Sequence, residues 1–446
     1  MRKCRFLIML AVAILVATVV APRAKAQTVT VLRTFHGSTD PLQPEGLVVD
    51  ATGTVYGSAN FGGAAGAGAR FKLDTQGVFT LFPDATDILT GPLGASKGLL
   101  LDAAGNLAFT APVGGQLGPG GFFKQDSKSG AITTIYSFGG LRQGPVPDGS
   151  VPLVNVVSDA AGNWYGTTFE GNATPVSGFC SIADVKGCGT VFKIDGKTGQ
   201  EAVLHSFSFP DGWAPLGLAI DGRGNLYGAT LQGGGPNCKD SGNAAFSVAG
   251  CGDLFRIDST GVFQVTHFFH HRFVSPFLGG PVSPPGGEVH GDHPKFVTVD
   301  DTGTVFGVTQ SGGNFGWGVI FKLDPFGNYT VLHHFAGPGD GLDAEAILLK
   351  DDKLYGANGL GGDILNCGFG TGCGTIYRVD TTTGKFTVLH TFRDIRKGAG
   401  PTALAIDAAG NLYVGTTFGG DLNSPDPNCS VIGCGNLIKL TLSRSH

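Results

Sequence analysis

The sequence has few charged residues, almost no methionine and no long apolar run after its first 26 residues. Charged residues make up 15% of the 446 residues, and both methionines, Met1 and Met9, lie in the N-terminal segment. Helical spacing of apolar residues appears nowhere after that segment. We therefore expect neither a membrane span nor a helical domain in the mature chain.

Familiar catalytic and nucleotide-binding signatures are also absent. There is no Gly-x-Ser-x-Gly elbow, no phosphate-binding loop and no His-Glu-x-x-His motif. Removing residues 1–26 takes away five basic residues and no acidic ones, so the charge balance becomes 25 − 35 = −10. Nucleic acids and anionic membranes bind clustered Lys and Arg, so we expect neither as a partner.

Residues 1–26 have the features of a secretory signal peptide. Arg2 and Lys3 give a basic start, 6–20 is an apolar core, and Ala24-Lys25-Ala26 is a cleavage site. We expect a secreted or periplasmic protein, a monomer, with one domain over 27–446.

The mature chain repeats four short segments in a fixed order, which we call A, B, C and D. Gly accounts for 75 of 446 residues, and it separates segments rich in β-branched and aromatic residues, as in hairpins. Typical B, C and D segments are 225–230, 189–195 and 331–335. Segment A is a run that usually ends in Asp, over 46–50, 98–102, 153–159, 216–221, 295–300, 346–350 and 403–407.

Counting the segments predicts the architecture. Seven copies of each give 28 strands, which predicts an all-β, seven-bladed β-propeller with four antiparallel strands per blade. The mature chain begins with a D segment at 28–35 and finishes with a C segment at 435–441. We therefore expect the N-terminal strand to pair with the last blade and close the ring, which removes an exposed edge.

The segment order also predicts two different faces. The A-to-B and C-to-D turns, short and uniform, form what we call the turn face. The B-to-C and D-to-A loops, longer and more variable, form the loop face. Binding segments usually lie on variable loops of a rigid scaffold, so we expect the loop face to carry any ligand.

Eight cysteines remain after the signal segment, and all lie in B-to-C loops. An even number in an exported chain favours disulfides, and the repeat register favours local pairing. A zinc site is the alternative, but the pairs belong to different blades and lack the usual C-x2-C spacing. The expected pairs are Cys180 with Cys188, Cys238 with Cys251, Cys367 with Cys373, and Cys429 with Cys434.

Three strings of the repeat resemble a known family. Asn-Leu-Tyr-Gly-Ala-Thr at 225–230, Gly-Thr-Val-Phe-Lys-Ile-Asp at 189–195 and Val-Leu-His-Ser-Phe at 203–207 resemble the GloVer tandem-repeat proteins of bacteria, and the likeness covers 28–441. It implies export and no particular activity. Ala108 stands where Tyr is usual, and the family's common C-terminal anchor is not recognisable. More distantly, the repeat is similar to NHL-repeat and streptogramin-lyase propellers.

The longest D-to-A insertion concentrates candidate metal ligands: Glu288, His290, Asp292 and His293. If the segment is extended, alternate residues point the same way and offer oxygen and nitrogen ligands to a divalent metal. Streptogramin lyases, which the chain resembles in outline, use His and Glu with Mg²⁺. The alternative is a loose loop, because Pro and Gly fill 281–287 and give a poor frame for coordination.

Two residue types recur at fixed positions of the repeat. Histidines on outer D strands would lie far apart, so we interpret them as half-buried structural residues. Acids in the D-to-A loops either form Asp-Gly turns that bond their own backbone or make a cation-binding ring at the channel mouth. The histidines are His205, His267, His333 and His390, and the acids are Asp40, Asp148, Asp211, Asp292 and Asp340.

These observations favour an exported, non-catalytic scaffold that binds a glycan or a surface protein on its loop face. The rival hypothesis is a metal-dependent lyase or lactonase with a site at the channel mouth, and propellers host both kinds of protein. A cluster around the axis would favour the enzyme, drawn from Glu45, Glu288, His290, Asp292, His293 and Glu345.

Overall fold

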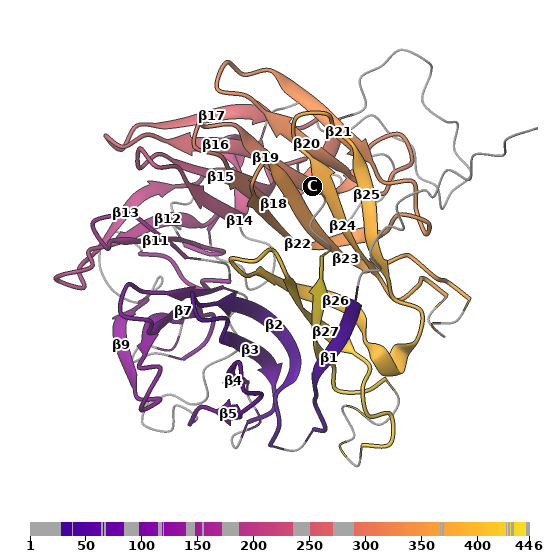
Figure 1. Ribbon diagram of the computed structural model, residues 1–446. Helices are drawn as coiled ribbons and strands as arrows, with labels where there is room; N and C mark the ends of the chain where they lie inside the picture. Colours follow the sequence, from indigo (N-terminus) through magenta and orange to yellow (C-terminus); the bar gives the residue numbers. More distant parts are fainter. Residues whose placement is uncertain are drawn as a thin grey trace, which may run out of the picture.

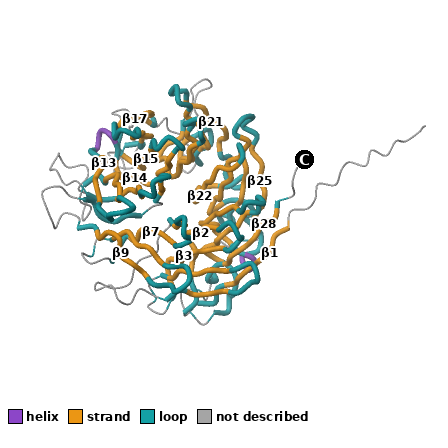
Figure 2. Tube along the Cα trace, turned by 60° about the vertical axis from the view of Figure 1, so that its left-hand side comes forward, coloured by secondary structure: helices purple, strands orange, loops and turns teal. Residues whose placement is uncertain are grey.

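The computed structural model describes residues 28–442 except 38, 64–65, 67, 84–97, 115–117, 119, 140–147, 154–155, 172–186, 235–249, 271–289, 366, 368–369, 425, 427–428 and 430–431. The described strands form seven four-stranded antiparallel sheets, arranged as blades around a centre (Figure 1). The predicted seven-bladed β-propeller is confirmed. Turned by 60°, the molecule shows strands joined almost entirely by turns and loops (Figure 2).

Within each blade the strands follow one another in chain order from the innermost outward, except that β1 completes the last blade. Blade I has β2 (Leu42–Val49), β3 (Val55–Phe61), β4 (Ala69–Leu73) and β5 (Phe79–Leu81); blade II has β6 (Leu99–Leu101), β7 (Leu107–Ala111), β8 (Gly121–Gln125) and β9 (Ile132–Ser137); blade III has β10 (Val157–Ser158), β11 (Trp164–Thr168), β12 (Thr190–Ile194) and β13 (Glu201–Ser206). Blade IV has β14 (Trp213–Ile220), β15 (Leu226–Gln232), β16 (Asp253–Ile257) and β17 (Phe263–Phe268); blade V has β18 (Gly291–Val299), β19 (Val305–Gly312), β20 (Val319–Leu323) and β21 (Tyr329–His334). Blade VI has β22 (Leu342–Lys350), β23 (Lys353–Leu360), β24 (Thr375–Asp380) and β25 (Phe386–Thr391); blade VII has β26 (Ala399–Ile406), β27 (Leu412–Phe418), β28 (Asn436–Thr441) and β1 (Thr28–Thr34). Two short 3-10 turns lie in D-to-A loops, η2 (Phe209–Asp211) and η3 (Ile395–Lys397).

The ring closes through the N-terminal strand, as predicted. β1 is antiparallel to β28, with Thr28 opposite Thr441 and Thr34 opposite Asn436. In Figure 1 the indigo strand β1 lies beside the yellow strands of blade VII, which it completes as the outermost strand. The first and last strands of the chain therefore share one sheet, and this pairing covers the edge that β28 would otherwise expose.

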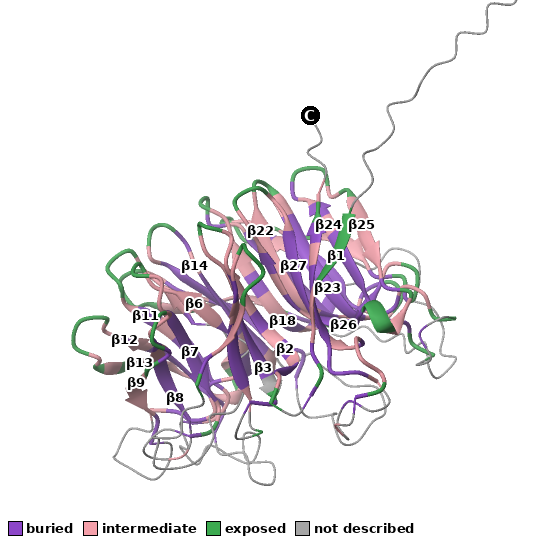
Figure 3. Ribbon diagram, turned by 60° about the horizontal axis from the view of Figure 1, so that its bottom comes forward, coloured by how far each residue is buried: buried purple, intermediate pink, exposed green. Residues whose placement is uncertain are grey.

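In blades I, III, IV, V and VI a glycine of the B strand makes room for an aromatic ring of the C strand beside it. A Cβ built on Gly307 would lie 2.3 Å from Phe321 Cζ, and one on Gly356 would lie 2.1 Å from Tyr377 Cζ. Phe321 and Tyr377 are both fully buried. The Gly of the Asn-Leu-Tyr-Gly string is thus required by packing, because the ring lies across the neighbouring backbone. Figure 3 shows these central strands as mostly buried, with exposed residues gathered at the turns.

The inner strands of blades I, IV, V, VI and VII begin three or four residues before the predicted A segments. Segment A of blade I is predicted at 46–50, whereas β2 starts at Leu42 and has a register shift between Pro44 and Gly46. The start includes a residue with positive φ, Gln43 at 57°. Equivalent positive φ values occur at Val151, Ala214, His293, Asp343 and Gly400. Such bulges kink a strand and change the direction of its side chains. In this ring they lie where the D-to-A loops enter the inner strands, at the loop face.

No helix within the described residues is long and apolar enough to cross a membrane.

Candidate functional site

The turn face is built from one repeated hydrogen-bond pattern. Asp324 Oδ1 accepts the backbone N–H groups of Phe326 at 2.9 Å and Asn328 at 2.8 Å. The side chain and the backbone of Asn328 hold the pKa of Asp324 below its usual range. These carboxylates therefore serve their own turns. Similar turns begin at Asp50, Asp74, Asp102, Asp126, Asp159, Asp195, Asp221, Asp258, Asp300, Asp380 and Asp407.

The loop face is tied together by backbone bonds between blades. In four places the positive-φ residue of an inner strand donates its N–H to the carbonyl of the cysteine that precedes strand C of the previous blade. The bonded pairs are Gln43 with Cys434 (3.1 Å), Ala214 with Cys188 (3.2 Å), His293 with Cys251 (2.9 Å) and Gly400 with Cys373 (2.9 Å). The cysteines therefore sit where neighbouring blades meet.

The described disulfides join cysteines of the same loop, as the repeat register predicts. Cys367 is bonded to Cys373 and Cys429 to Cys434. Cys188 and Cys251 are disulfide-bonded too, and their expected partners, Cys180 and Cys238, lie outside the described residues. Each bridge fixes a short loop beside an interblade hydrogen bond, so it should limit motion of the loop face.

Charged side chains from two inner strands meet at the channel. Lys295 Nζ, on β18, lies 2.9 Å from Glu345 Oε1 and 3.3 Å from Asp343 Oδ1, both on β22. Burial alone would lower the pKa of Lys295, but the two carboxylates more than offset it and raise that pKa. The Asp343 side chain remains 36% exposed. Glu345 is therefore part of an ion-paired cluster, and Asp343 is open to solvent.

The predicted metal ligands are only partly brought together. Asp292 is 1% exposed and accepts a hydrogen bond from Ser311 Oγ, while His293 Nδ1 lies 3.1 Å from Asp292 Oδ1. The His290 ring instead packs against Tyr329, with centroids 4.7 Å apart. Glu288 lies outside the described residues. The part of the chain that the structure describes holds no group of three His, Cys, Asp or Glu placed to bind a metal.

The grouping of Asp292 with the recurrent acids is wrong by two residues. Gly291 packs against Thr309 as Gly341 packs against Asn358, so the residue before Gly291, His290, occupies the position of Asp340. Asp292 instead takes the buried position held by Leu342 in blade VI and by Leu42 and Trp213 in blades I and IV. A long insertion before this segment hides the register in the sequence.

The recurrent His and the recurrent acid meet in what we call interblade joints. A joint contains a D-strand side chain, the D-to-A loop residue before the recurrent Gly, and the first residue of the next D strand. Between blades V and VI, His333 Nε2 lies 2.7 Å from Asp340 Oδ2. The His333 ring stacks on Phe386 with centroids 3.7 Å apart and planes 3° apart. Three side chains thus tie an outer strand, its loop and the next blade.

The joint between blades III and IV repeats this geometry. His205 Nε2 lies 3.0 Å from Asp211 Oδ2, and its ring stacks on Phe263 at 3.5 Å. Burial would raise the pKa of Asp211, but hydrogen bonds from His205 and Ser208 outweigh it and lower that pKa. Asp211 also accepts the backbone N–H of Ser208 at 2.7 Å. The acid therefore both forms its own turn and orients the imidazole.

Other side chains replace His in two further joints. Between blades VII and I, Arg33 Nη2 donates to Asp40 at 2.9 Å and its guanidinium lies 4.2 Å from the Phe79 ring centre. Between blades II and III, Tyr136 donates to Asp148 at 2.6 Å. Burial and Asp148 together raise the pKa of Tyr136. In these four joints the D-strand position therefore holds a planar side chain that is hydrogen-bonded to an acid of the D-to-A loop.

The joint between blades IV and V has no acid. His267 stacks on Tyr329 with centroids 4.3 Å apart, and His290 lies in the acid position, 5.7 Å from His267. Burial, followed by the nearby His290, lowers the pKa of His267 to about 4. Both imidazoles are therefore engaged in blade packing.

Sequence reasoning missed one buried acid, Asp253, at the start of β16. It is 0% exposed, and neither carboxyl oxygen has a hydrogen-bond partner among the described residues. Burial, with a smaller contribution from Asp211, raises its pKa to about 8. The signal is available in the sequence: Asp follows Gly-Cys-Gly in this blade, where blades III and VI have Thr190 and Thr375.

The comparisons with known proteins agree with this architecture. Residues 243–425 match the Gloeobacter/Verrucomicrobia repeat. This confirms the family resemblance over those residues, and blades I to III have the same strand order in the structure. No curated protein matches the chain.

Several solved structures share the fold at low sequence identity. U3-55K is 11% identical with a TM-score of 0.54, over 93% of this chain and 98% of that one. The extracellular domain of the one component system BT4673 from B. thetaiotaomicron is 10% identical with a TM-score of 0.51, over 94% of this chain. The match spans only 42% of that chain. A gluconolactonase from Xanthomonas campestris, XC5397, is 12% identical with a TM-score of 0.43, over 94% and 91% of the two chains. The first two similarities show the fold alone.

Proposed function

We propose that the protein is an exported, non-catalytic binding scaffold whose loop face holds a glycan or a surface protein. One observation carries the proposal: the recurrent imidazoles and carboxylates of the D strands and D-to-A loops lie in separate joints between different pairs of blades. Acid–base catalysis needs such groups to converge on one reacting atom. A rigid ring with variable loops suits recognition.

The channel mouth offers the polar contacts that such a ligand needs. Asp343 is partly exposed beside the Lys295–Glu345 pair. Carboxylates that are already oriented by an ion pair lose little freedom when they accept hydrogen bonds from ligand hydroxyls. A glycan, which is rich in hydroxyl groups, fits this chemistry.

The test is binding of the mature protein to glycan arrays and to surface-protein fractions, beside two variants. D343N should lower the affinity of the ligand found by about tenfold or more, the cost of weakening one charge-assisted hydrogen bond. D301N, on the exposed turn face, is the matched control and should bind like the wild type. Equal binding by all three proteins would place the ligand away from the channel mouth and contradict the proposal.

Export is part of the same proposal. Cleavage after Ala26 would leave a mature chain that begins at Gln27. N-terminal sequencing of protein recovered from outside the cytoplasm should therefore start at that residue. Retention of Met1 in all recovered protein would contradict export by this route.

The metal-dependent lyase or lactonase remains a second candidate because of one specific feature. Asp292 is a buried acid where other blades have Leu or Trp, and it is bonded to His293 beside the channel. With Glu288 these residues would offer oxygen and nitrogen ligands to a divalent ion. Metal analysis, with melting in the presence and absence of a chelator, separates the candidates. A stoichiometric ion that is lost in E288Q and D292N would favour the enzyme, whereas melting unaffected by the chelator would contradict it.

A further inference from the structure

One interblade joint lacks two of its three side chains. Between blades VI and VII the D-strand residue is His390, but the ring position is held by Val29, the second residue of β1. Val29 pairs with Leu440 of strand C as Phe386 pairs with Val379 one joint earlier. The loop residue before the recurrent Gly is Lys397, where Asp340 stands one joint earlier. Gly398 fixes this alignment, because it packs against Thr416 as Gly212 packs against Thr230.

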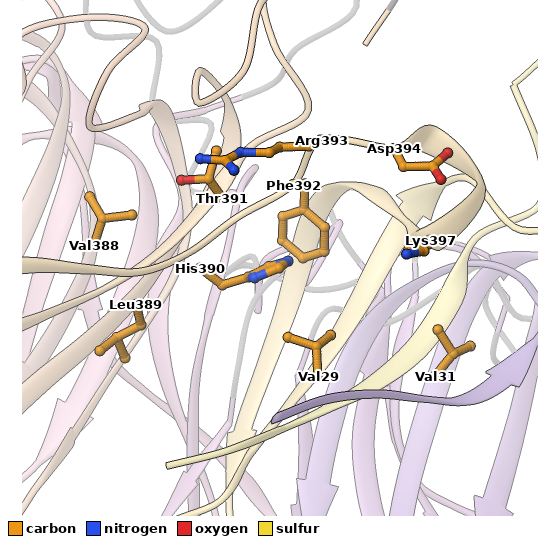
Figure 4. A pocket seen from close by; sticks show the side chains of 10 residues that line it. All are labelled: Val29, Val31, Val388, Leu389, His390, Thr391, Phe392, Arg393, Asp394 and Lys397. Carbon is orange, nitrogen blue, oxygen red and sulfur yellow. The ribbon is translucent and has the colours of Figure 1, made fainter. Parts of the chain in front are cut away.

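The missing side chains leave a groove on the outer rim. It has a volume of about 640 Å³, within the range of small-molecule sites. Val29 and Val31 of β1, which are 39% and 40% exposed, face His390 and Lys397 across it (Figure 4). Among the described residues, no ring from blade VII stacks on His390 and no carboxylate is hydrogen-bonded to it. The two complete histidine joints, III–IV and V–VI, have both a planar partner and an acid at these places.

The groove combines apolar walls with positive charge. Lys397 and Arg393 both line it, and Arg393 is 74% exposed, with its nearest carboxylate, Asp363, 4.0 Å away. Asp394 also lines the groove, but Arg396 lies 3.0 Å from its carboxylate and offsets that charge. The groove therefore favours an anion. Burial, and then Arg393, lower the pKa of His390, so its neutral ring is available for stacking.

We propose that this groove binds a small aromatic carboxylate. The ligand's ring takes the place that Phe386 and Phe263 occupy beside their histidines, 3.7 and 3.5 Å away between centroids. Its carboxylate takes the place of Asp340 and Asp211, which lie 2.7 and 3.0 Å from the imidazole Nε2. Lys397 and Arg393 supply the charge that holds it. The ligand completes the joint that the chain leaves unfinished.

This site is separate from the channel mouth, so it stands or fails independently of the proposed function. Its ligand would be a small molecule at the rim, whereas the channel mouth is proposed to hold a glycan or a protein. A single-site small-molecule isotherm unaffected by D343N would distinguish the two.

Calorimetric titration of the mature protein with three probes tests the proposal. Cinnamate carries both ring and charge, cinnamide lacks the charge, and 3-cyclohexylpropanoate lacks the aromatic ring. Cinnamate should bind once per chain with a dissociation constant on the order of 1 mM or tighter. Each of the other probes should bind at least tenfold more weakly. Equal affinity for cinnamate and the saturated acid, or for cinnamate and cinnamide, would overturn the proposal.

Two variants localise the binding, and a third is the control. V29F fills the groove with the chain's own ring, and K397D replaces the cation by the acid of the other joints. Each should weaken cinnamate binding at least tenfold. K385D makes the same charge change at an exposed lysine of blade VI outside the groove and should keep wild-type affinity. Unchanged binding in V29F and K397D, with all variants folded by circular dichroism, would place the probe elsewhere and overturn the proposal.

Discussion

Two neighbouring joints of the same ring show which contacts between blades are kept and which side chains can be replaced. Between blades V and VI, His333 has both a carboxylate and an aromatic ring as partners. Between blades VI and VII, His390 faces Lys397 and Val29 across an open groove. Two residues after each histidine is a buried Phe, whose N–H donates to a Gly carbonyl at 3.1 Å in both joints. The bonded pairs are Phe335 with Gly318 and Phe392 with Gly374. Backbone bonds and buried Phe residues thus set the propeller geometry, and the outer side chains decide whether a joint is filled or available to a ligand.

Replacing the ring of the complete joint should have the largest effect. F386V gives this joint the residue of its incomplete neighbour and removes ring contacts to His333, Phe335 and Tyr377. We expect a loss of about 2–3 kcal/mol in the free energy of unfolding, measured with urea. F326V is the control because Phe326 is 90% exposed, and it should change stability by less than about 0.5 kcal/mol. Similar stabilities for the two variants would show that the stack does not hold the blades together.

Removing the loop residue should have the next largest effect, and it should destabilise the complete joint far more than the incomplete one. D340A deprives His333 of its acid and leaves the N–H of Ala336 without the carboxylate that accepts it at 3.0 Å. We expect a loss of about 2 kcal/mol, because unsatisfied groups remain in the joint. K397A at the incomplete joint should change stability by less than about 0.5 kcal/mol. Equal losses in the two variants would mean that the acid has no special role.

The first residue of strand C offers a comparison within the blades. Blade IV has the acid Asp253 there, whereas blades III, VI and VII have the neutral Thr190, Thr375 and Asn436. The pKa of Asp253 is raised to about 8 by burial and then by Asp211. A raised carboxyl pKa contributes stability that is present below the unfolded pKa and lost as pH rises through the folded pKa. D253N should therefore match the wild type near pH 4 and be more stable by about 1–2 kcal/mol at pH 9. Denaturation curves at both pH values check this, and a pH-independent difference would contradict it.

The blade count and ring closure could be predicted from the sequence because their signals are local. Gly turns and alternating β-branched residues mark each strand, and a leading D segment at 28–35 requires a partner in the last blade. The joints could not be derived in the same way. His333 and Asp340 recur visibly, but their contact with Phe386 joins residues of two blades. Only the fold brings them together.

The candidate site shows where register was lost. The insertion before Asp292 differs in length from the other D-to-A loops. Matching acid to acid therefore selected Asp292, two residues after His290, which holds the acid position. Spacing to the following proline would have corrected it, since Gly291 and Pro294 match Gly212 and Pro215. Residues that depend on backbone position are better aligned by Gly and Pro than by charge, because Gly and Pro report the backbone conformation directly.

Completing the unfinished joint should have the smallest effect on stability. The double variant V29F/K397D gives His390 the ring and the acid of the other joints, at positions that line one groove. We expect a gain of about 0.5–1 kcal/mol, with the double variant more stable than the sum of the single changes because ring and acid act on the same imidazole. Urea denaturation of all four proteins gives this coupling. Strict additivity would mean that the new ring and the new acid do not act together on His390, whereas positive coupling would show that the groove has the geometry of a joint that a ligand can complete.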